Sequence, residues 1–142
     1  ALGKIDPGAK TTEMALIEAR RDDDRWVQMA AFQALAKIEP EGTNAVPLLI
    51  EALKDQDKGV RWQAAEALGN IGPDAKEAVP ALIESLKDED QGVRESAAIA
   101  LGNIGPDAKA AVPILTEVLK DEDKYVREGA AWALEKINTP EA

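Results

Sequence analysis

Residues 55–87 read DQDKGVRWQAAEALGNIGPDAKEAVPALIESLK, and residues 88–120 read DEDQGVRESAAIALGNIGPDAKAAVPILTEVLK, so one 33-residue stretch occurs twice in succession. The two copies are identical at 24 of 33 positions. The same period continues on both sides, as the recurring leucines show: Leu35, Leu68, Leu101 and Leu134. Self-similarity at a fixed period indicates a repeat architecture. We therefore expect one domain over residues 1–142, with a stub at 1–5 and repeats at about 6–38, 39–71, 72–104 and 105–138.

Each repeat is predicted to form two helices joined by a turn. In the first helix, apolar residues fall at the i, i+3, i+4 and i+7 spacing of an amphipathic helix: Val79, Leu82, Ile83 and Leu86. Asp90 is placed to cap a second helix over about 91–104, and Gly105-Pro106 ends it. No stretch alternates with period two, and neither helix can bury its apolar stripe alone. The sequence therefore predicts an all-α fold, an α-solenoid of stacked helix pairs, and we expect its superhelix to be right-handed.

The repeated string VRxxAAxALGNIGPDAKxAVPxL resembles the HEAT-like repeats of the phycobilisome-lyase type, and the resemblance covers essentially the whole chain. It implies that one face of each second helix lines the concave side of a superhelix. It also implies a structural polar ladder built from aspartate and arginine residues six positions apart: Asp55 and Arg61, Asp88 and Arg94, Asp121 and Arg127. Gln28 departs from this pattern, so we expect the first helix pair to lack one ion pair of the ladder.

Composition and charge exclude several classes of function. The net charge of −10 repels phosphate backbones and anionic lipids, so nucleic acid and membranes are poor partners. With no histidine and no cysteine, the chain has no zinc site of the usual kinds, no cysteine nucleophile, no Ser-His pair and no disulfide. We therefore expect no cofactor, no metal and no enzymatic activity. The absence of cysteine and of a long apolar run fits a cytoplasmic protein.

The positions at which the copies differ indicate a binding face. When the repeats are aligned, each position of the 33-residue unit forms a column of equivalent residues. Five columns on one side of the second helix hold four of the five aromatic residues. Because Trp and Tyr dominate binding hot spots, this enrichment favours a surface that binds a protein or peptide. The predicted concave-face site consists of Trp26, Met29, Gln33, Trp62, Gln63, Glu66, Glu95, Ile99, Tyr125, Glu128 and Trp132. One apolar spot is expected near Trp26, Met29 and Trp62, and a second near Ile99, Tyr125 and Trp132.

Chemical roles for the acidic residues are less favoured than a role in binding. Asp55, Asp57 and Glu66 stand where an EF-hand loop has calcium ligands, but Val60 takes the place that needs glycine. The glutamates of the predicted face are better explained as charges beside a binding patch than as a catalytic pair. The predicted function is a non-catalytic interaction scaffold for a partner with some basic character. Two alternatives stay open: a structural segment of a longer solenoid or one that self-associates through its open ends, and an engineered HEAT-like binding protein.

Overall fold

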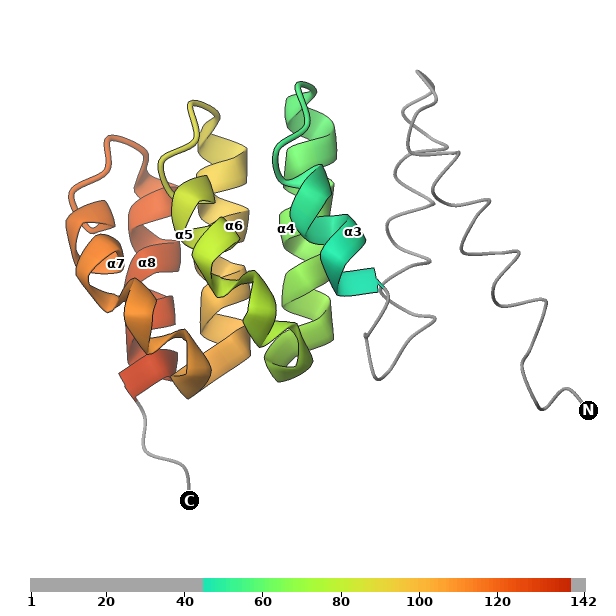
Figure 1. Ribbon diagram of the computed structural model, residues 1–142. Helices are drawn as coiled ribbons and strands as arrows, with labels where there is room; N and C mark the ends of the chain where they lie inside the picture. The colour runs from blue at the N-terminus through green and yellow to red at the C-terminus, as the bar shows by residue number, and fades with distance from the viewer. Residues whose placement is uncertain (1–44, 139–142) are drawn as a thin grey trace, which may run out of the picture.

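The computed structural model describes residues 45–138, and every element in this range is a helix (Figure 1). In chain order the elements are α3 (Ala45–Ala52), α4 (Lys58–Ile71), the 3-10 helix η1 (Gly72–Ala78), α5 (Val79–Ser85), α6 (Gln91–Ile104), the 3-10 helix η2 (Gly105–Ala111), α7 (Val112–Val118) and α8 (Lys124–Asn138). No strand occurs in this range, in agreement with the predicted all-α class. The expected stub and the first expected repeat, 1–5 and 6–38, lie outside the described residues.

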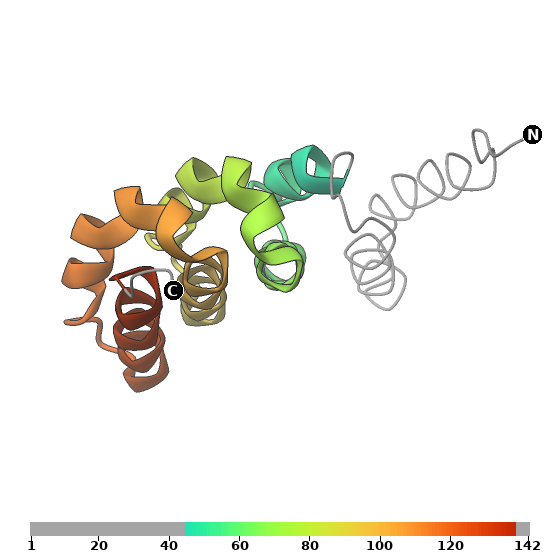
Figure 2. The ribbon, with the colours of Figure 1, turned by 90° about the horizontal axis from the view of Figure 1, so that it is seen from below.

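The helices form the two layers of an α-solenoid. The short helices α3, α5 and α7, which we call the A helices, form one layer, and the longer B helices α4, α6 and α8 lie side by side in the other (Figure 1). Figure 2 shows the A helices on the outer side of a curve and the B helices on its inner side. We therefore call the exposed surface of the B helices the inner face and that of the A helices the outer face.

Aspartate side chains fix the start of each B helix. Asp90 accepts a hydrogen bond from the backbone N–H of Val93 at 3.1 Å and caps α6. Asp57 does the same for α4 at 2.7 Å, and Asp123 for α8 at 3.0 Å. Each cap satisfies a backbone donor that has no partner within the helix, and its negative charge opposes the helix dipole. These contacts confirm that aspartates cap the B helices of the described range.

A Gly-Pro step ends α4 and α6, as predicted. Gly72 and Gly105 have φ angles of 78° and 83°, a left-handed conformation that side-chain-bearing residues rarely adopt. The 3-10 helices η1 and η2 then lead to the next A helix. Pro80 and Pro113 stand in the first turn of α5 and α7, where a missing N–H costs no hydrogen bond. The repeated GNIGPDAK string therefore sets the same reversal of direction in both repeats.

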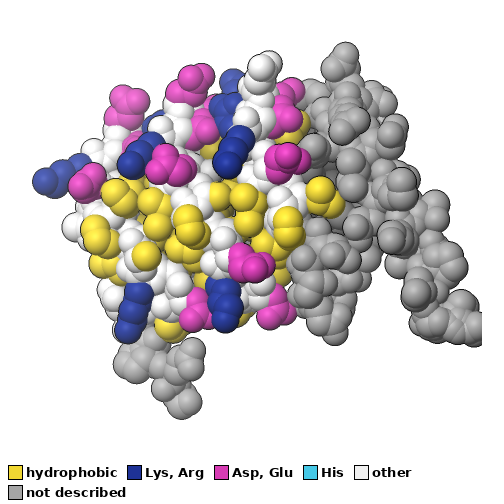
Figure 3. All heavy atoms as spheres, viewed as in Figure 1, with side chains coloured by type: hydrophobic (Ala, Val, Ile, Leu, Met, Phe, Trp, Pro, Cys, Tyr) yellow, Lys and Arg dark blue, Asp and Glu magenta, His cyan; other side chains and the backbone are white. Residues whose placement is uncertain are grey.

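The core between the two layers is aliphatic. Its largest fully buried side chains are Leu49, Leu68, Leu82, Leu101, Ile104, Leu115, Ile137, Val46, Val60, Val93 and Val126. Over residues 45–138 no aromatic side chain belongs to this buried set, although Trp132 packs against its edge. On the outer face, hydrophobic side chains form a band between two charged edges (Figure 3). Because the core needs no aromatic ring, the exposed aromatic residues of the described range require another explanation.

Candidate functional site

An ion-pair ladder joins successive repeats at the end where each A helix turns into its B helix. Arg61 donates from Nε and Nη2 to the two carboxylate oxygens of Asp88 at 2.8 and 3.1 Å, and Arg94 donates in the same way to Asp121 at 2.9 and 3.1 Å. Nη1 of Arg61 donates to the main-chain carbonyl of Asp55 at 2.8 Å. The ladder is thus built from the aspartates and arginines named from the sequence. The aspartate six positions before the arginine contributes its main-chain carbonyl, and the carboxylate partner stands in the next repeat.

The ladder reaches its last described arginine at Arg127. Its Nη1 donates to the carbonyls of Asp121 and Glu122 at 2.7 and 3.2 Å, but no carboxylate within residues 45–138 forms a salt bridge with it. At the other end, the spacing that links Arg61 to Asp88 would link position 28 to Asp55. Gln28 occupies that position, and it lies outside the described residues.

The ladder shifts the pKa of two of its groups. The pKa of Arg61 lies above its ordinary value, chiefly because the guanidinium donates hydrogen bonds to Asp88. Burial is the largest single influence on Asp121 and acts to raise its pKa. Hydrogen bonds from the Asp123 backbone N–H and from Arg94, with the nearby arginine charges, outweigh burial and lower the pKa of Asp121 below its usual range. Both shifts favour the charged forms that make the ladder.

Three of the predicted inner-face residues expose large apolar side chains. The exposed fraction is 41% for Trp62, 38% for Ile99 and 60% for Tyr125. Trp132 is half-buried because one side of its ring packs on the core edge. An exposed aromatic side chain away from a core is typical of a recognition surface.

Other predicted residues of this face are placed differently or not described. Gln63 departs from the expectation, because only 4% of its surface is exposed and its side chain lies beneath the inner face. Glu66 and Glu128 are exposed, and Glu95 is half-buried. Three further predicted residues lie outside the described residues: Trp26, Met29 and Gln33. The predicted N-terminal apolar spot is therefore represented in the described range by Trp62.

A pocket of about 260 Å³ opens between α6 and α8. It is lined by Glu95, Ile99, Tyr125, Glu128, Gly129 and Trp132. The structure thus brings together the three residues of the predicted C-terminal apolar spot and two of the predicted glutamates. Gly129 contributes no side chain to this pocket, although a Cβ there would be in ordinary contact, 3.6 Å from Cβ of Ala98. Gly129 was not predicted, although a glycine in the column of Gln63 and Ser96 is a visible signal.

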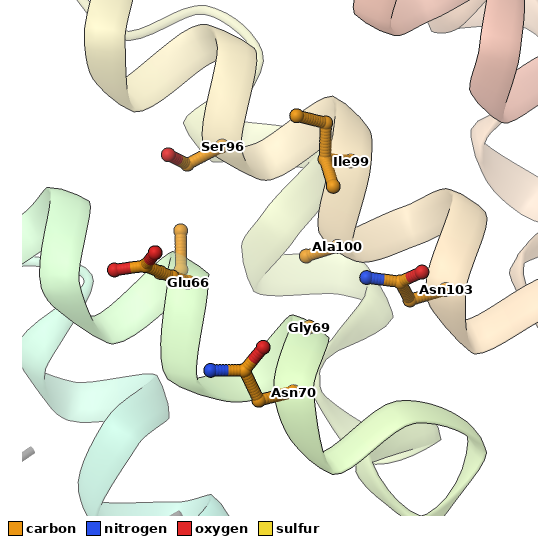
Figure 4. Close-up of a pocket in the computed structure, with 8 residues that line it drawn as sticks. Glu66, Gly69, Asn70, Ser96, Ile99, Ala100 and Asn103 are labelled. Atoms are coloured by element: carbon orange, nitrogen blue, oxygen red, sulfur yellow. The ribbon is translucent and has the colours of Figure 1, made fainter. Parts of the chain in front are cut away.

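A second pocket, of about 160 Å³, lies between α4 and α6 and is more polar. Figure 4 shows Glu66 and Asn70 on α4, with Ser96, Ile99 and Asn103 on α6, around the backbone of Gly69. The sequence analysis predicted only Glu66 and Ile99 of this set. Asn70 and Asn103 are equivalent residues of the two copies. Because they are identical, the differences between the copies give no signal at this position.

Gly69 and Gly102 occupy the same position in two repeats, but an indole ring covers only Gly102. A Cβ on Gly102 would lie 2.8 Å from Cε3 of Trp132 and 3.0 Å from Cα of Ala133, so the indole ring lies directly over this glycine. In the α4–α6 gap Ile99 stands in the column of Trp132, so no ring covers Gly69, which lines the pocket although a Cβ there would lie 3.1 Å from Cα of Ala100. The Nζ of Lys136 lies 5.9 Å from the centroid of the Trp132 ring, close enough for a cation–π contact.

The described range holds neither a metal-binding cluster of side chains nor a membrane-spanning helix. Among residues 45–138, no three His, Cys, Asp or Glu side chains come together in a way that could hold a metal ion. None of the helices described is long and apolar enough to cross a membrane.

Comparison with known proteins identifies this architecture. The HEAT repeat family matches the chain at residues 12–102 and 79–142. The chain belongs to the HEAT repeat family. The comparison with curated proteins found no match. Among solved structures, this HEAT repeat protein is similar to an engineered protein at 31% identity and a TM-score of 0.69, over 94% of this chain and 68% of the other.

Two further solved structures resemble this HEAT repeat chain. A second engineered protein shares 28% identity at a TM-score of 0.68, and the match covers 89% of this chain and 62% of that protein. A designed armadillo repeat protein shares the fold at 23% identity and a TM-score of 0.65, over 87% of this chain and 63% of the other. The chain therefore spans less than two thirds of the length of these two proteins.

Proposed function

We propose that this HEAT repeat protein is a non-catalytic scaffold that binds a protein or peptide along its inner face. The observation that carries the proposal is the pocket between α6 and α8, where Ile99, Tyr125 and Trp132 meet. Exposed aromatic and aliphatic side chains gathered in one concavity are typical of binding hot spots. The charge of −10 and the groove glutamates favour a partner with basic character over a nucleic acid.

A structural role through end-to-end stacking is less well supported. Arg127 has no carboxylate partner in the described range, which is what an open ladder would present to a following repeat. Glu135, however, stands in the column of Gly69 and Gly102. A B helix packed on α8 as α8 packs on α6 would meet this side chain where even a Cβ is crowded. Stacking in the geometry of the described repeats is therefore disfavoured.

The engineered alternative is supported by the similarity to two engineered proteins. The narrower likeness to the phycobilisome-lyase type, the right-handed superhelix and a cytoplasmic location stay predictions.

Selection from a random peptide library on the immobilised protein tests the proposal. The double variant Ile99→Ser, Tyr125→Ser removes the two exposed apolar side chains of the α6–α8 pocket. Leu119→Ser is the control, because Leu119 is 38% exposed at the C-cap of α7, away from the inner face. We expect selected peptides to bind the control as they bind the unaltered protein, and to lose at least about tenfold in affinity for the double variant. Equal losses in the two variants, with folding intact in both, would contradict an inner-face site.

A further inference from the structure

We propose that the pocket between α6 and α8 binds an arginine side chain of the partner, an inference that rests on the proposed function and names the chemistry of its contact. Three properties of the pocket carry it: an aromatic and aliphatic wall, two carboxylates without partners, and the absence of a basic residue from its lining. An arginine combines an apolar stem with a flat cation, and so matches all three.

The wall of the pocket offers a flat surface to a planar cation. Tyr125 is 60% exposed, so one face of its ring is available to a ligand. The Trp132 ring is already engaged, with Gly102 beneath it and the Nζ of Lys136 at 5.9 Å from its centroid. We therefore assign the stacking contact with a guanidinium to Tyr125, and the contact with the aliphatic stem to Ile99 and the edge of Trp132.

The two carboxylates of the pocket are unpaired in the described range. Within residues 45–138, neither Glu95 nor Glu128 takes part in a hydrogen bond or an ion pair. This contrasts with Asp88 and Asp121, each of which is bound by two nitrogens of an arginine. A cation that entered the pocket could donate charge-assisted hydrogen bonds to both carboxylates.

Arginine fits this combination better than lysine. The guanidinium is planar and weakly hydrated, stacks on aromatic rings, and presents five donors that can serve two carboxylates at once. The lysine ammonium is compact and strongly hydrated, so it loses more solvation beside Ile99 and Tyr125 and gains no stacking area. An uncharged leucine would fill the volume but leave both carboxylates without a partner.

The first test uses a defined probe and does not depend on any selected partner. N-acetyl-arginine methylamide is titrated into the full chain, and the NMR shifts of the Ile99 methyl and the Trp132 indole N–H are followed. The lysine and leucine equivalents serve as comparison probes. We expect the arginine probe to bind several-fold more tightly than either, with shifts concentrated at this pocket rather than at Asn70 and Asn103. Equal binding of the leucine probe, or shifts spread evenly over the acidic surface, would overturn the proposal.

Paired variants test the role of the carboxylates. The double variant Glu95→Gln, Glu128→Gln keeps the shape of the pocket and removes its charge. The double variant Glu84→Gln, Glu117→Gln is the matched control, because it removes the same charge from two exposed glutamates of the A helices, away from the inner face. We expect the pocket variant to weaken binding of the arginine probe by about tenfold and the control to leave it unchanged. An equal effect of the two variants would show unspecific attraction by negative charge and refute the assignment.

The peptide selection separates failure of this inference from failure of the proposed function. If peptides are selected that need Ile99 and Tyr125 but carry no excess of arginine, the scaffold binds at the inner face and the arginine assignment is wrong. If no peptide needs these residues, the proposed function fails, while the titration with the arginine probe still decides whether the pocket is selective for that side chain. Enrichment of arginine that is lost when selection is repeated on the Glu95→Gln, Glu128→Gln variant supports both.

Discussion

Between α4 and α6 the cavity lies toward the C-terminal halves of the helices, around Gly69 and Asn103, whereas between α6 and α8 it lies toward their N-terminal halves, around Gly129 and Tyr125. Two columns explain this shift. Ile99 leaves Gly69 without a ring above it, whereas Trp132 covers Gly102. In the other column Ser96 carries a side chain where Gly129 carries none. The helix pairs α4–α6 and α6–α8 are packed alike. The place of the pocket in each gap therefore depends on where a large side chain fills the gap and where a glycine contributes no side chain.

The edge of the solenoid does not differ between the two gaps. The Arg61–Asp88 and Arg94–Asp121 pairs have the same donors and acceptors and agree within 0.1 Å in their shortest distance, 2.8 against 2.9 Å. The frame is thus held by a constant ladder and a constant aliphatic core, and the inner face is free to vary. The inner face can therefore change from repeat to repeat without a change in how the repeats join.

The largest effect expected from this comparison is a difference between two glycine substitutions. Gly102→Ala should lower the free energy of unfolding by about 1–3 kcal/mol, because the new methyl group would overlap the Trp132 ring. Gly69→Ala should cost less, since its Cβ would lie 3.1 Å from Cα of Ala100 and 3.3 Å from Nδ2 of Asn103. Alanine also gains up to about 1 kcal/mol of helix propensity at either site. Urea denaturation of both variants measures the difference.

A double-mutant cycle shows whether the ring is the cause. In a Trp132→Leu background, Gly102→Ala should cost no more than Gly69→Ala does in the unaltered protein, because only backbone crowding remains. If Gly102→Ala stays the more costly change without the indole, the two gaps differ in helix spacing instead of in side-chain filling.

A second, smaller effect is expected from removing the ladder arginines. Arg94→Met should cost about 2 kcal/mol, because it removes two charge-assisted hydrogen bonds and leaves the half-buried Asp121 without its partner. Arg61→Met should cost a similar amount if the two gaps share one frame. Arg127→Met is the control, and should cost less than about 1 kcal/mol, because this arginine is exposed and bonds only carbonyl oxygens in the described range. Equal losses at Arg94 and Arg127 would mean that the carboxylates contribute nothing measurable.

The sequence alone predicts the helices because each is marked by local chemistry. Apolar spacing, the capping aspartates and the Gly-Pro step all act within one repeat, so they can be read without knowing which repeat lies beside which. Internal variation also located Ile99, Tyr125 and Trp132, which the structure brings into one pocket.

What the sequence did not predict depends on contacts between repeats. The spacing of six between Asp55 and Arg61 is local, but the carboxylate partner of Arg61 is set by how the next repeat stacks. Gln63 was expected on the inner face from its angle on the helix, but only 4% of its surface is exposed, and burial cannot be read from an angle on one helix. Differences between copies also give no signal where a column is constant, as for Asn70 and Asn103.

The smallest effect expected is a pH dependence of the α6–α8 gap. Because the pKa of Asp121 is lowered in the folded protein, the unfolded chain takes up a proton at this residue first as the pH falls. The stabilisation from Asp121 is therefore fully present above its unfolded pKa of about 3.9, and is lost progressively as the pH falls toward the lower folded value.

The variant Asp121→Asn has no carboxylate at this position, so its stability contains no such pH-dependent contribution. The difference in unfolding free energy between the unaltered protein and this variant, measured in urea from about pH 6 to pH 3, should be constant near neutrality and shrink in acid. In an Arg94→Met background the shrinkage should be smaller, since one of the groups that lower the pKa is gone. A difference that stays constant to pH 3 would show that burial, which acts in the opposite direction, cancels the arginine and backbone donors at Asp121, and that the ladder joins the repeats without holding this carboxylate charged.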